Sequence, residues 1–105
     1  MKQVIEGKIY NTETAEELHS WSNHLSGSDF SHCEESLYLT KKGAFFLAGS
    51  GGPMSKYSES NGNSTSGSSG ISVLSEAEAV AWLEDNDGSE VLTDHPAFKS
   101  VVVEG

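Results

Sequence analysis

The stretch CEESLYLTKKGAFFLAG, residues 33–49, constrains the fold more than any other part of the chain. Its side chains alternate with a period of two, so that Leu37 and Leu39 fall on one face and Tyr38 on the other. The KKG in the middle has the composition of a tight turn, after which AFFLA returns along the first strand. Because both faces carry large apolar groups, we expect a β-hairpin that is central in its sheet and at least partly covered on both sides.

The segments before this hairpin predict a strand and then a helix. Residues 3–10, QVIEGKIY, alternate around Gly7 and indicate one short strand. In residues 11–25, Thr14 and Glu17 have the spacing of a capping box, and the apolar residues recur at helical spacing. We therefore expect an amphipathic helix of about three turns over this segment.

A second helix is predicted towards the C-terminal end. ISVLS indicates a short strand, and its last residue, Ser75, forms a capping box with Glu78. Trp82 falls on the apolar side of the helix that follows, so we expect it in the core, and Gly88 is expected to end that helix. The final segment, SEVLTDHPAFKSVVVEG, leaves two alternatives open: a short helix around its proline, or a strand formed by its three valines.

Between the hairpin and the second helix lies a run of serine, glycine and asparagine. It has too few apolar groups to offset the entropy of ordering, so residues 58–70 are predicted to form a mobile loop rather than a helix or strand. With 105 residues the chain can bury one modest core, so we expect a single domain over residues 1–105. The expected fold class is α+β: a small antiparallel sheet, in β-α-β-β-loop-β-α order, packed by two amphipathic helices.

Charge restricts the partners that the chain can have. Six Lys, no Arg and sixteen Asp plus Glu give a formal net charge of −10. Such a surface repels nucleic-acid phosphates and anionic lipids, so direct binding to nucleic acid or to a membrane is disfavoured and a basic protein surface is the natural complement. The plain alternative is that the charge only maintains solubility. No apolar stretch is long enough for a membrane span or a leader, and we expect a cytoplasmic protein.

The stretch AGSGGPMSKYSES invites comparison with a phosphate-binding loop. With Lys56 in the lysine position of that motif, the two glycine positions fall on Ser50 and Ser55 and the hydroxyl position falls on Tyr57. No helix is predicted after the stretch to complete an anion site. We interpret it as a turn, and keep a ligand site formed by Ser55, Lys56 and Tyr57 beside the glycine pair Gly51-Gly52 as the alternative.

Other catalytic or metal-binding patterns are weak. His19, His24, His32 and Cys33 offer four possible metal ligands within fifteen residues, but the paired spacing that structural zinc sites use is missing. Adjacent strand residues point to opposite faces, so His32 and Cys33 would not pair as an activated thiol. We expect no metal, no cofactor and no catalytic residue, and we expect Cys33 to be a small core residue without an internal disulfide partner.

Acidic residues form the candidate binding surface. Glu13, Glu16 and Glu17 have the spacing of one stripe on the first predicted helix. Glu84, Asp85 and Asp87 come at the C-terminal end of the second predicted helix, where the helix dipole disfavours negative charge. Carboxylates placed against this preference indicate a surface that serves a basic partner, as in a protein that imitates the phosphate rows of DNA.

Several motifs resemble a group of small bacterial proteins of mobile-element and phage type. The shared patterns are Y-[DN]-T-[ED]-T-A near the start, LY-x-T-K-x-G-x-F-F in the hairpin, GG-x-x-S-K-Y, and L-S-x-x-E-A-x-x-W-L-E, and they cover residues 8–85. The resemblance implies a mobile-element context and no particular activity. The positions to which it draws attention are Tyr10, Thr12, Gly51, Gly52, Ser55, Lys56, Tyr57 and Trp82. Here the region after Tyr57 is unusually rich in serine.

The sequence therefore leaves two alternative functions open. The first is a non-enzymatic acidic protein-binding module, an accessory or inhibitor of the anti-CRISPR or anti-restriction type that engages a basic surface of a host nucleic-acid-handling protein. The second is a small-molecule-binding or enzymatic domain that uses the Gly51-Gly52 and Ser55-Lys56-Tyr57 turn. A pocket lined by that turn would favour the second, and an acidic face would favour the first.

Overall fold

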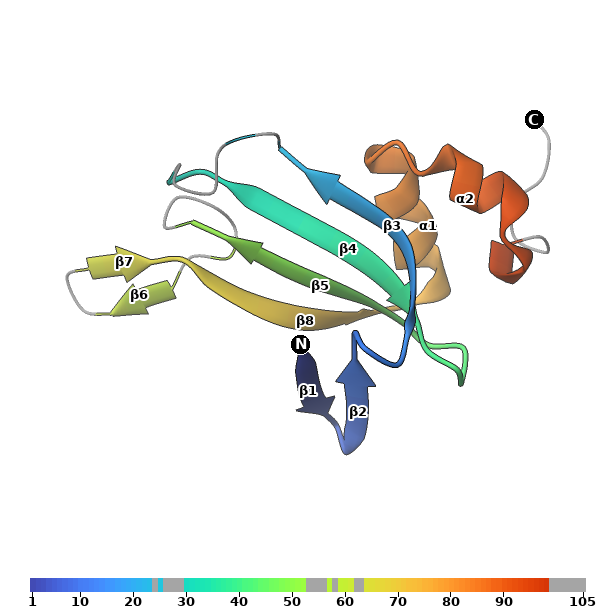
Figure 1. Cartoon of the computed structure of the whole chain (residues 1–105), viewed down its shortest axis with the longest axis horizontal. Helices are drawn as coiled ribbons and strands as arrows, with labels where there is room; N and C mark the ends of the chain where they lie inside the picture. Colours follow the sequence, from blue (N-terminus) through green and yellow to red (C-terminus); the bar gives the residue numbers. More distant parts are fainter. Residues whose placement is uncertain (24, 26–29, 53–56, 58, 62–63, 99–105) are drawn as a thin grey trace.

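The described strands all come before the two helices along the chain (Figure 1). The computed structural model describes residues 1–98 apart from 24, 26–29, 53–56, 58 and 62–63. The elements within these residues are β1 (Lys2–Ile5), β2 (Lys8–Asn11), β3 (Glu16–Ser22), β4 (Cys33–Leu39), β5 (Phe45–Gly51), β6 (Glu59–Asn61), β7 (Ser64–Ser66), β8 (Ser68–Leu74), α1 (Glu76–Asp85), α2 (Ser89–Asp94) and the 3-10 helix η1 (Pro96–Phe98). The α+β class and the antiparallel pairing are confirmed. The predicted β-α-β-β-loop-β-α order is wrong, because no described helix lies between strands.

The central sheet has four antiparallel strands in the order β3-β4-β5-β8. β4 and β5 pair in continuous register, from Cys33 opposite Gly51 to Leu39 opposite Phe45. The hairpin predicted from the period-two pattern is therefore confirmed, and its strands are the two inner strands of the sheet. The strand predicted in ISVLS is also confirmed, as part of β8.

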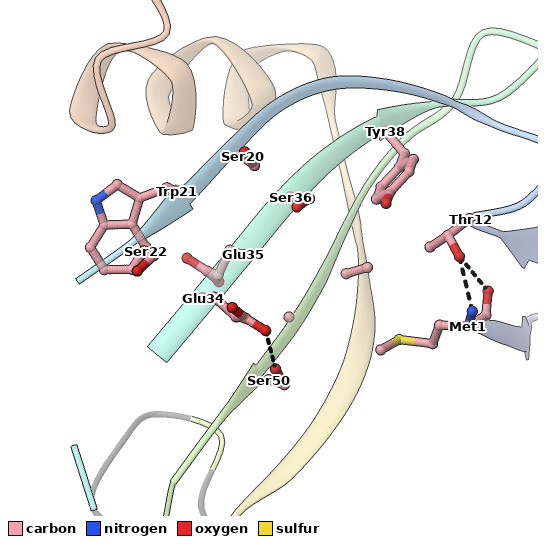
Figure 2. Close-up of a pocket in the computed structure, with 12 residues that line it drawn as sticks. Met1, Thr12, Ser20, Trp21, Ser22, Glu34, Glu35, Ser36, Tyr38 and Ser50 are labelled. Carbon is pink, nitrogen blue, oxygen red and sulfur yellow. Dashed lines mark hydrogen bonds between the residues drawn. The ribbon is translucent and has the colours of Figure 1, made fainter. Parts of the chain in front are cut away.

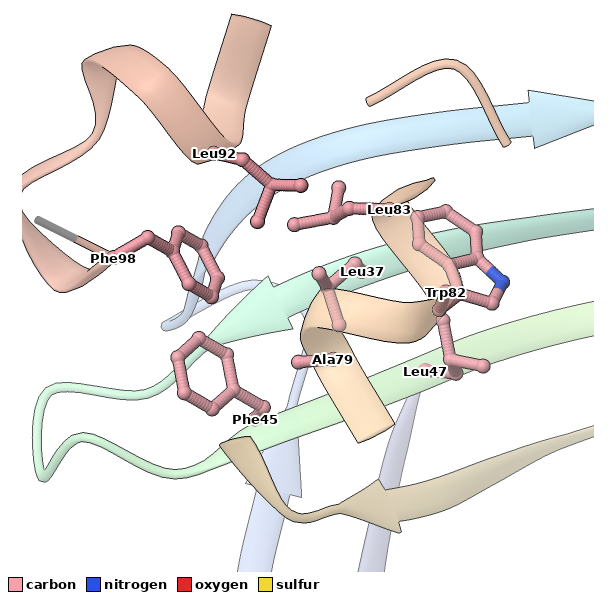
Figure 3. Packing of buried hydrophobic residues seen from close by; sticks show 8 residues of the cluster. All are labelled: Leu37, Phe45, Leu47, Ala79, Trp82, Leu83, Leu92 and Phe98. Carbon is pink, nitrogen blue, oxygen red and sulfur yellow. The ribbon is translucent and has the colours of Figure 1, made fainter. Parts of the chain in front are cut away.

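Both helices pack on one face of this sheet (Figures 1 and 3). The core there joins side chains of β4, β5, α1, α2 and η1: Leu37, Phe45, Leu47, Ala79, Trp82, Leu83, Leu92 and Phe98. The rings of Phe45 and Phe98 stack with their centroids 5.3 Å apart. Trp82 is only 9% exposed, which confirms its prediction as a core residue.

The opposite face of the sheet is covered in part by the β1–β2 hairpin. Tyr10 of β2 packs edge-on against Phe46 of β5, and Tyr38 of β4 stacks on Phe46 from the other side. Ile71 of β8 completes this smaller core. Both faces of the β4–β5 hairpin are therefore covered, as the apolar residues on both faces predicted.

The first predicted helix is wrong, because residues 16–22 form the edge strand β3. The hydroxyl of Thr14 donates to the carbonyl of Asn11, and the amides of residues 13–15 also bond to Asn11, so the expected cap is part of a turn. Ala15 packs against the smaller core and Leu18 against the larger one, so the apparent helical stripe divides between two faces. Tertiary contacts with β4 and the helices outweigh the local helical preference.

The single strand predicted over residues 3–10 is also wrong, because the segment forms the hairpin β1–β2. Glu6 and Gly7 both have positive φ, 51° and 78°. Ile5 and Lys8 face each other across these two residues, which is the geometry of a two-residue hairpin turn. The sequence did not predict this turn, because asparagine or aspartate, and not glutamate, usually precedes the glycine of such turns.

The predicted loop over residues 58–70 contains strands in its described part, residues 59–61 and 64–70. β6 and β7 pair with each other, and Ser68, Ser69 and Gly70 pair with β5 as the first part of β8. The expectation that no strand forms here is wrong, because backbone hydrogen bonding to β5 orders a segment that lacks apolar side chains. The predicted mobility stays a prediction.

The capping box of α1 is confirmed. Ser75 Oγ accepts from the amide of Glu78, and Glu78 Oε1 accepts from the amide of Ser75 at 2.9 Å. The backbone hydrogen bond from Ser75 to the Glu78 carboxylate, and then the interaction with the Ser75 side chain, lower the pKa of this carboxyl. The helix ends at Asp85, and the amide of Gly88 bonds back to the carbonyl of Leu83 before α2 begins. Of the two C-terminal alternatives, the helical one holds for residues 89–98, and the three valines lie outside the described residues.

Candidate functional site

The acidic residues of the first predicted stripe do not share one face. Glu16 lies on the helix side of β3, where its Oε2 is 3.0 Å from Nε2 of His95. Glu17 lies on the opposite side, where its Oε2 accepts from the hydroxyl of Tyr38 at 3.3 Å. Glu13 is exposed in the turn before β3. The predicted helical stripe is therefore wrong, because neighbouring strand residues alternate between faces.

The start of β3 instead faces α2 across a shallow acidic depression of about 350 Å³. Its lining residues are Glu16, Glu17, Leu18, Glu90, Val91, Asp94, His95 and Pro96. The carboxylates of Glu16, Glu90 and Asp94 line this depression without a lysine among its described lining residues, while the Glu17 carboxylate bonds to Tyr38 on the other side of β3. The bond between His95 and Glu16 holds the end of α2 against the edge strand.

The second predicted acidic group lies at the end of α1. Glu84, Asp85 and Asp87 are exposed, and the last turn of α1 holds no basic residue. Asp87 has a φ of 62°, a conformation that aspartate adopts more readily than most residues, so its position has a local reason. Nε2 of His19 lies 2.7 Å from the carbonyl oxygen of Asn86, which places this end of α1 beside β3. Both acidic groups therefore flank the same edge strand.

Tyr57, a residue of the alternative ligand site, points into the protein. Its hydroxyl donates to Oε2 of Glu35, and Nε1 of Trp82 donates to Oε1 of the same carboxylate at 3.2 Å. Burial, and then the hydrogen bond to Glu35, raises the pKa of the Tyr57 phenol well above its ordinary range. Ser55 and Lys56 lie outside the described residues.

Gly49 makes room for this arrangement. It lies opposite Glu35 in the β4–β5 register, and a Cβ at this position would collide with the Tyr57 ring and hydroxyl. Glu35 itself is 4% exposed, the one buried charged side chain among the residues described. Glu35, Gly49, Tyr57 and Trp82 thus form a clamp, which we call the Glu35 clamp, that holds Tyr57 and the end of α1 onto the sheet.

A polar depression of about 530 Å³ lies beside the β1–β2 hairpin (Figure 2). Small hydroxyl groups from three strands surround Glu34 there: Ser20, Ser22, Ser36 and Ser50. The hydroxyl of Ser50 donates to Glu34 at 3.3 Å, and His32 lies 3.6 Å from the same carboxylate. Hydroxyl groups around a carboxylate that already has partners do not select a class of ligand.

The possible metal ligands do not come together. His19 bonds to the turn after α1, and His32 Nδ1 lies 2.8 Å from the carbonyl oxygen of Leu25. Cys33 is buried, as expected of a core residue. Within the described part of the chain, no group of three His, Cys, Asp or Glu residues could hold a metal ion. His24 lies outside that part.

Sequence reasoning missed several of these residues. Glu90, Asp94 and His95 join the acidic surface only because β3 packs beside α2, and the prediction of a helix for residues 16–22 hid that contact. Glu35 gave a weak signal, since it alternates with Cys33 and Leu37 on the apolar face of a predicted strand. An acidic residue at a core position of a strand is a reason to look for hydrogen-bond donors.

No model of a known protein family, no curated protein and no solved structure matches the chain. The resemblance to mobile-element and phage proteins therefore stays a prediction. None of the described helices is long and apolar enough to cross a membrane.

Proposed function

We propose that the protein is a non-enzymatic binding module whose acidic surface engages a basic surface of another protein. The acidic surface is the set of carboxylates on the helix side of β3 and at the neighbouring helices: Glu16, Glu84, Asp85, Asp87, Glu90 and Asp94. The observation that carries the proposal is the acidic depression between β3 and α2, where carboxylates from distant parts of the chain converge. Glu13 lies in the preceding turn and the Glu17 carboxylate lies on the other side of β3, so both are left out of the proposed surface.

Local structure explains only part of this convergence: Glu16 bonds to His95, and Glu90 lies in the first turn of α2, where the helix dipole favours it. Like charges that line one depression repel each other, and Asp94 and Asp85 also sit at helix C-terminal ends, where the dipole disfavours them. Lysine or arginine side chains of a partner would remove both penalties on binding. Complementary charge also accelerates and orients association.

The depression has apolar walls as well as charge. Leu18, Val91 and Pro96 line it together with the carboxylates. An apolar side chain of the partner would be buried there, while basic residues on either side of it would meet Glu16, Glu90 and Asp94. The partner expected from this chemistry is a basic segment that carries an apolar anchor.

Proteins that handle nucleic acids carry such basic segments, because they bind phosphate. We therefore propose a host nucleic-acid-handling protein as the partner, and an accessory or inhibitory role of the anti-restriction or anti-CRISPR type. Charge complementarity supports the partner class, and the resemblance to mobile-element proteins supports the biological setting.

The alternative function, a ligand site at the Gly51-Gly52 and Ser55-Lys56-Tyr57 turn, has less support. The hydroxyl of Tyr57 is engaged by the buried carboxylate of Glu35, so this side chain has a structural role. Ser55 and Lys56 would have to bind the ligand without it.

The experiment is affinity capture from a host lysate at increasing salt, with the bound proteins identified by mass spectrometry. The test variant combines Glu16→Gln, Glu90→Gln and Asp94→Asn. The control variant combines Glu6→Gln, Glu34→Gln and Glu76→Gln, which removes the same number of charges away from the depression. We expect the test variant to lose basic proteins that the wild type and the control retain. A fourth protein, Lys56→Ala, tests the alternative site. If the wild type, the test variant and the control captured the same proteins and only Lys56→Ala lost them, the proposal would be refuted in favour of the Ser55-Lys56-Tyr57 turn.

A further inference from the structure

A third depression, of about 540 Å³, lies between β2 and the β4–β5 turn. Three of the chain's six lysines line it: Lys8, Lys41 and Lys42. Among the residues that the structure describes, no carboxylate lines it, although the chain has sixteen Asp and Glu residues. The nearest acidic residues along the chain, Glu6 and Glu13, are outside its lining.

The lysines have no competing partners in the described part of the chain. No ion pair joins any of the three to a described carboxylate. In a protein with a net charge of −10, three cations collected in one place without counter-charges form a locally positive site. Such a site attracts anions at short range.

Neutral hydrogen-bond donors stand beside the lysines. The amide oxygen of Asn11 accepts from the backbone of Glu13 at 2.9 Å, which leaves the amide nitrogen to donate. Oγ1 of Thr40 accepts from the amide of Ala44 at 3.0 Å, which leaves the hydroxyl hydrogen to donate. Both side chains line the depression and can complete the coordination of an anionic oxygen group.

The turn that carries two of the lysines is held in place. The amide of Thr40 donates to the carbonyl of Ala44 at 2.8 Å, and the amide of Gly43 donates to the carbonyl of Thr40 at 3.0 Å. Gly43 has a φ of 86°, a conformation that glycine adopts without strain. A fixed turn presents Lys41 and Lys42 with less loss of backbone entropy when a ligand binds.

The remaining walls are apolar. Ile9 is 66% exposed, although it is a large aliphatic residue, and Tyr10 and Ala44 provide further carbon surface. We propose that this lysine depression binds a small organic anion, in which one carboxylate or phosphate group is carried on an apolar body. The anionic group lies among Lys8, Lys41 and Lys42, and the apolar body covers Ile9.

The test is a titration of the ¹⁵N-labelled protein, followed by amide chemical shifts, with four separate probes. Phenyl phosphate and benzoate carry both features, inorganic phosphate carries only the charge, and benzyl alcohol carries only the apolar ring. We expect saturable shifts near Asn11, Thr40 and Gly43 with at least one of the two aromatic anions, and weaker binding of inorganic phosphate and benzyl alcohol. Which aromatic anion binds more tightly distinguishes a phosphate ligand from a carboxylate ligand.

Charge variants locate the binding. Replacing Lys41 and Lys42 together by Gln should lower the affinity for the aromatic anion about tenfold, because two charge contacts are lost. The control is Lys2→Gln, which removes a lysine of the β1–β2 hairpin that does not line the depression and should change affinity by less than about twofold. No saturable shift with either aromatic anion, or equal weakening by Lys2→Gln, would overturn the site. Equal affinity for inorganic phosphate and phenyl phosphate would overturn the role of the apolar walls.

Discussion

At the scale of single residues, the Glu35 clamp is the most specific feature of the structure. Trp82 could be predicted as a core residue from its place on an apolar helix side, but its bond to Glu35 could not, because it joins positions 47 residues apart. Glycines in AGSGGPMSKY could be read as turn formers, whereas Gly49 belongs to a strand and is needed for the close approach of Tyr57. Patterns within one segment report which face a residue occupies and say little about which distant side chain it meets.

Gly49→Ala should destabilise the protein by about 1–3 kcal/mol, because the new methyl group collides with Tyr57. The matched control is Gly70→Ala, the residue opposite Gly49 in β8, where an added Cβ meets nothing within 4 Å. The control should be neutral or slightly stabilising. Urea unfolding of both variants, followed by Trp fluorescence, measures the difference. In a Tyr57→Ala background the cost of Gly49→Ala should largely disappear, and an unchanged cost there would contradict the proposed collision.

The Tyr57 phenol makes stability depend on alkaline pH. Burial and the bond to Glu35 raise its pKa above the ordinary 10.0, so the folded state holds the phenolic proton more tightly than the unfolded chain does. The resulting stability is fully present below pH 10 and is lost as the pH rises above that value. Tyr38 is shifted in the same direction by burial and by Glu17, so part of this loss belongs to it.

Tyr57→Phe should therefore lower stability by about 1–2 kcal/mol at neutral pH, because Glu35 loses a hydrogen-bond donor. The variant should also lose less stability than the wild type as the pH rises above 10. Urea midpoints measured on both sides of pH 10 give the two effects separately. Tyr38→Phe is the comparison, with a smaller change expected because Tyr38 bonds to the exposed Glu17. If the stability of the Tyr57→Phe variant fell above pH 10 as steeply as that of the wild type, the Tyr57 phenol would not be the cause of the pH dependence.

At the scale of elements, the long period-two segment of the β4–β5 hairpin was predicted well, and polar segments were not. The β4–β5 hairpin has large apolar groups on both faces, and this pattern leaves few other folds for it. In β3 the bulge between Glu17 and His19 breaks the alternation, so Leu18 and Trp21 both reach the larger core while mimicking helical spacing. Backbone pairing with a neighbouring strand, which orders Ser68, Ser69 and Gly70, leaves no trace in side-chain hydrophobicity.

The β6–β7 pair should be dispensable, whereas the start of β8 should not. The main described contacts of the β6–β7 pair are between its own two strands. Replacing residues 59–66 by a short Gly-Ser turn should therefore change stability by less than about 1 kcal/mol. Extending the replacement through Gly70 removes three residues paired with β5 and should cost considerably more. Thermal unfolding of the two variants checks this. Equal stabilities would contradict the assignment of residues 68–70 to the central sheet.

At the scale of the whole molecule, the two kinds of charge gather on different parts of one small fold. Carboxylates flank the edge strand β3, and three lysines gather where the β1–β2 hairpin meets the β4–β5 turn. Net charge could be read from composition, and it predicted a basic partner without locating the surface. The location required the packing of β3 beside α2, which depends on contacts between residues far apart in the chain, such as that between Glu16 and His95, 79 positions apart.

The proposed function requires that the acidic depression between β3 and α2 is a binding surface. The most direct measurement is a titration of the ¹⁵N-labelled protein, at low and at physiological salt, with a short peptide in which a leucine is flanked by lysines. The account predicts saturable shifts at Leu18, Val91 and His95, weaker binding at higher salt, and loss of these shifts when Glu16, Glu90 and Asp94 are neutralised. Shifts centred elsewhere on the protein, or shifts at these residues that survive the neutralisation, would contradict it.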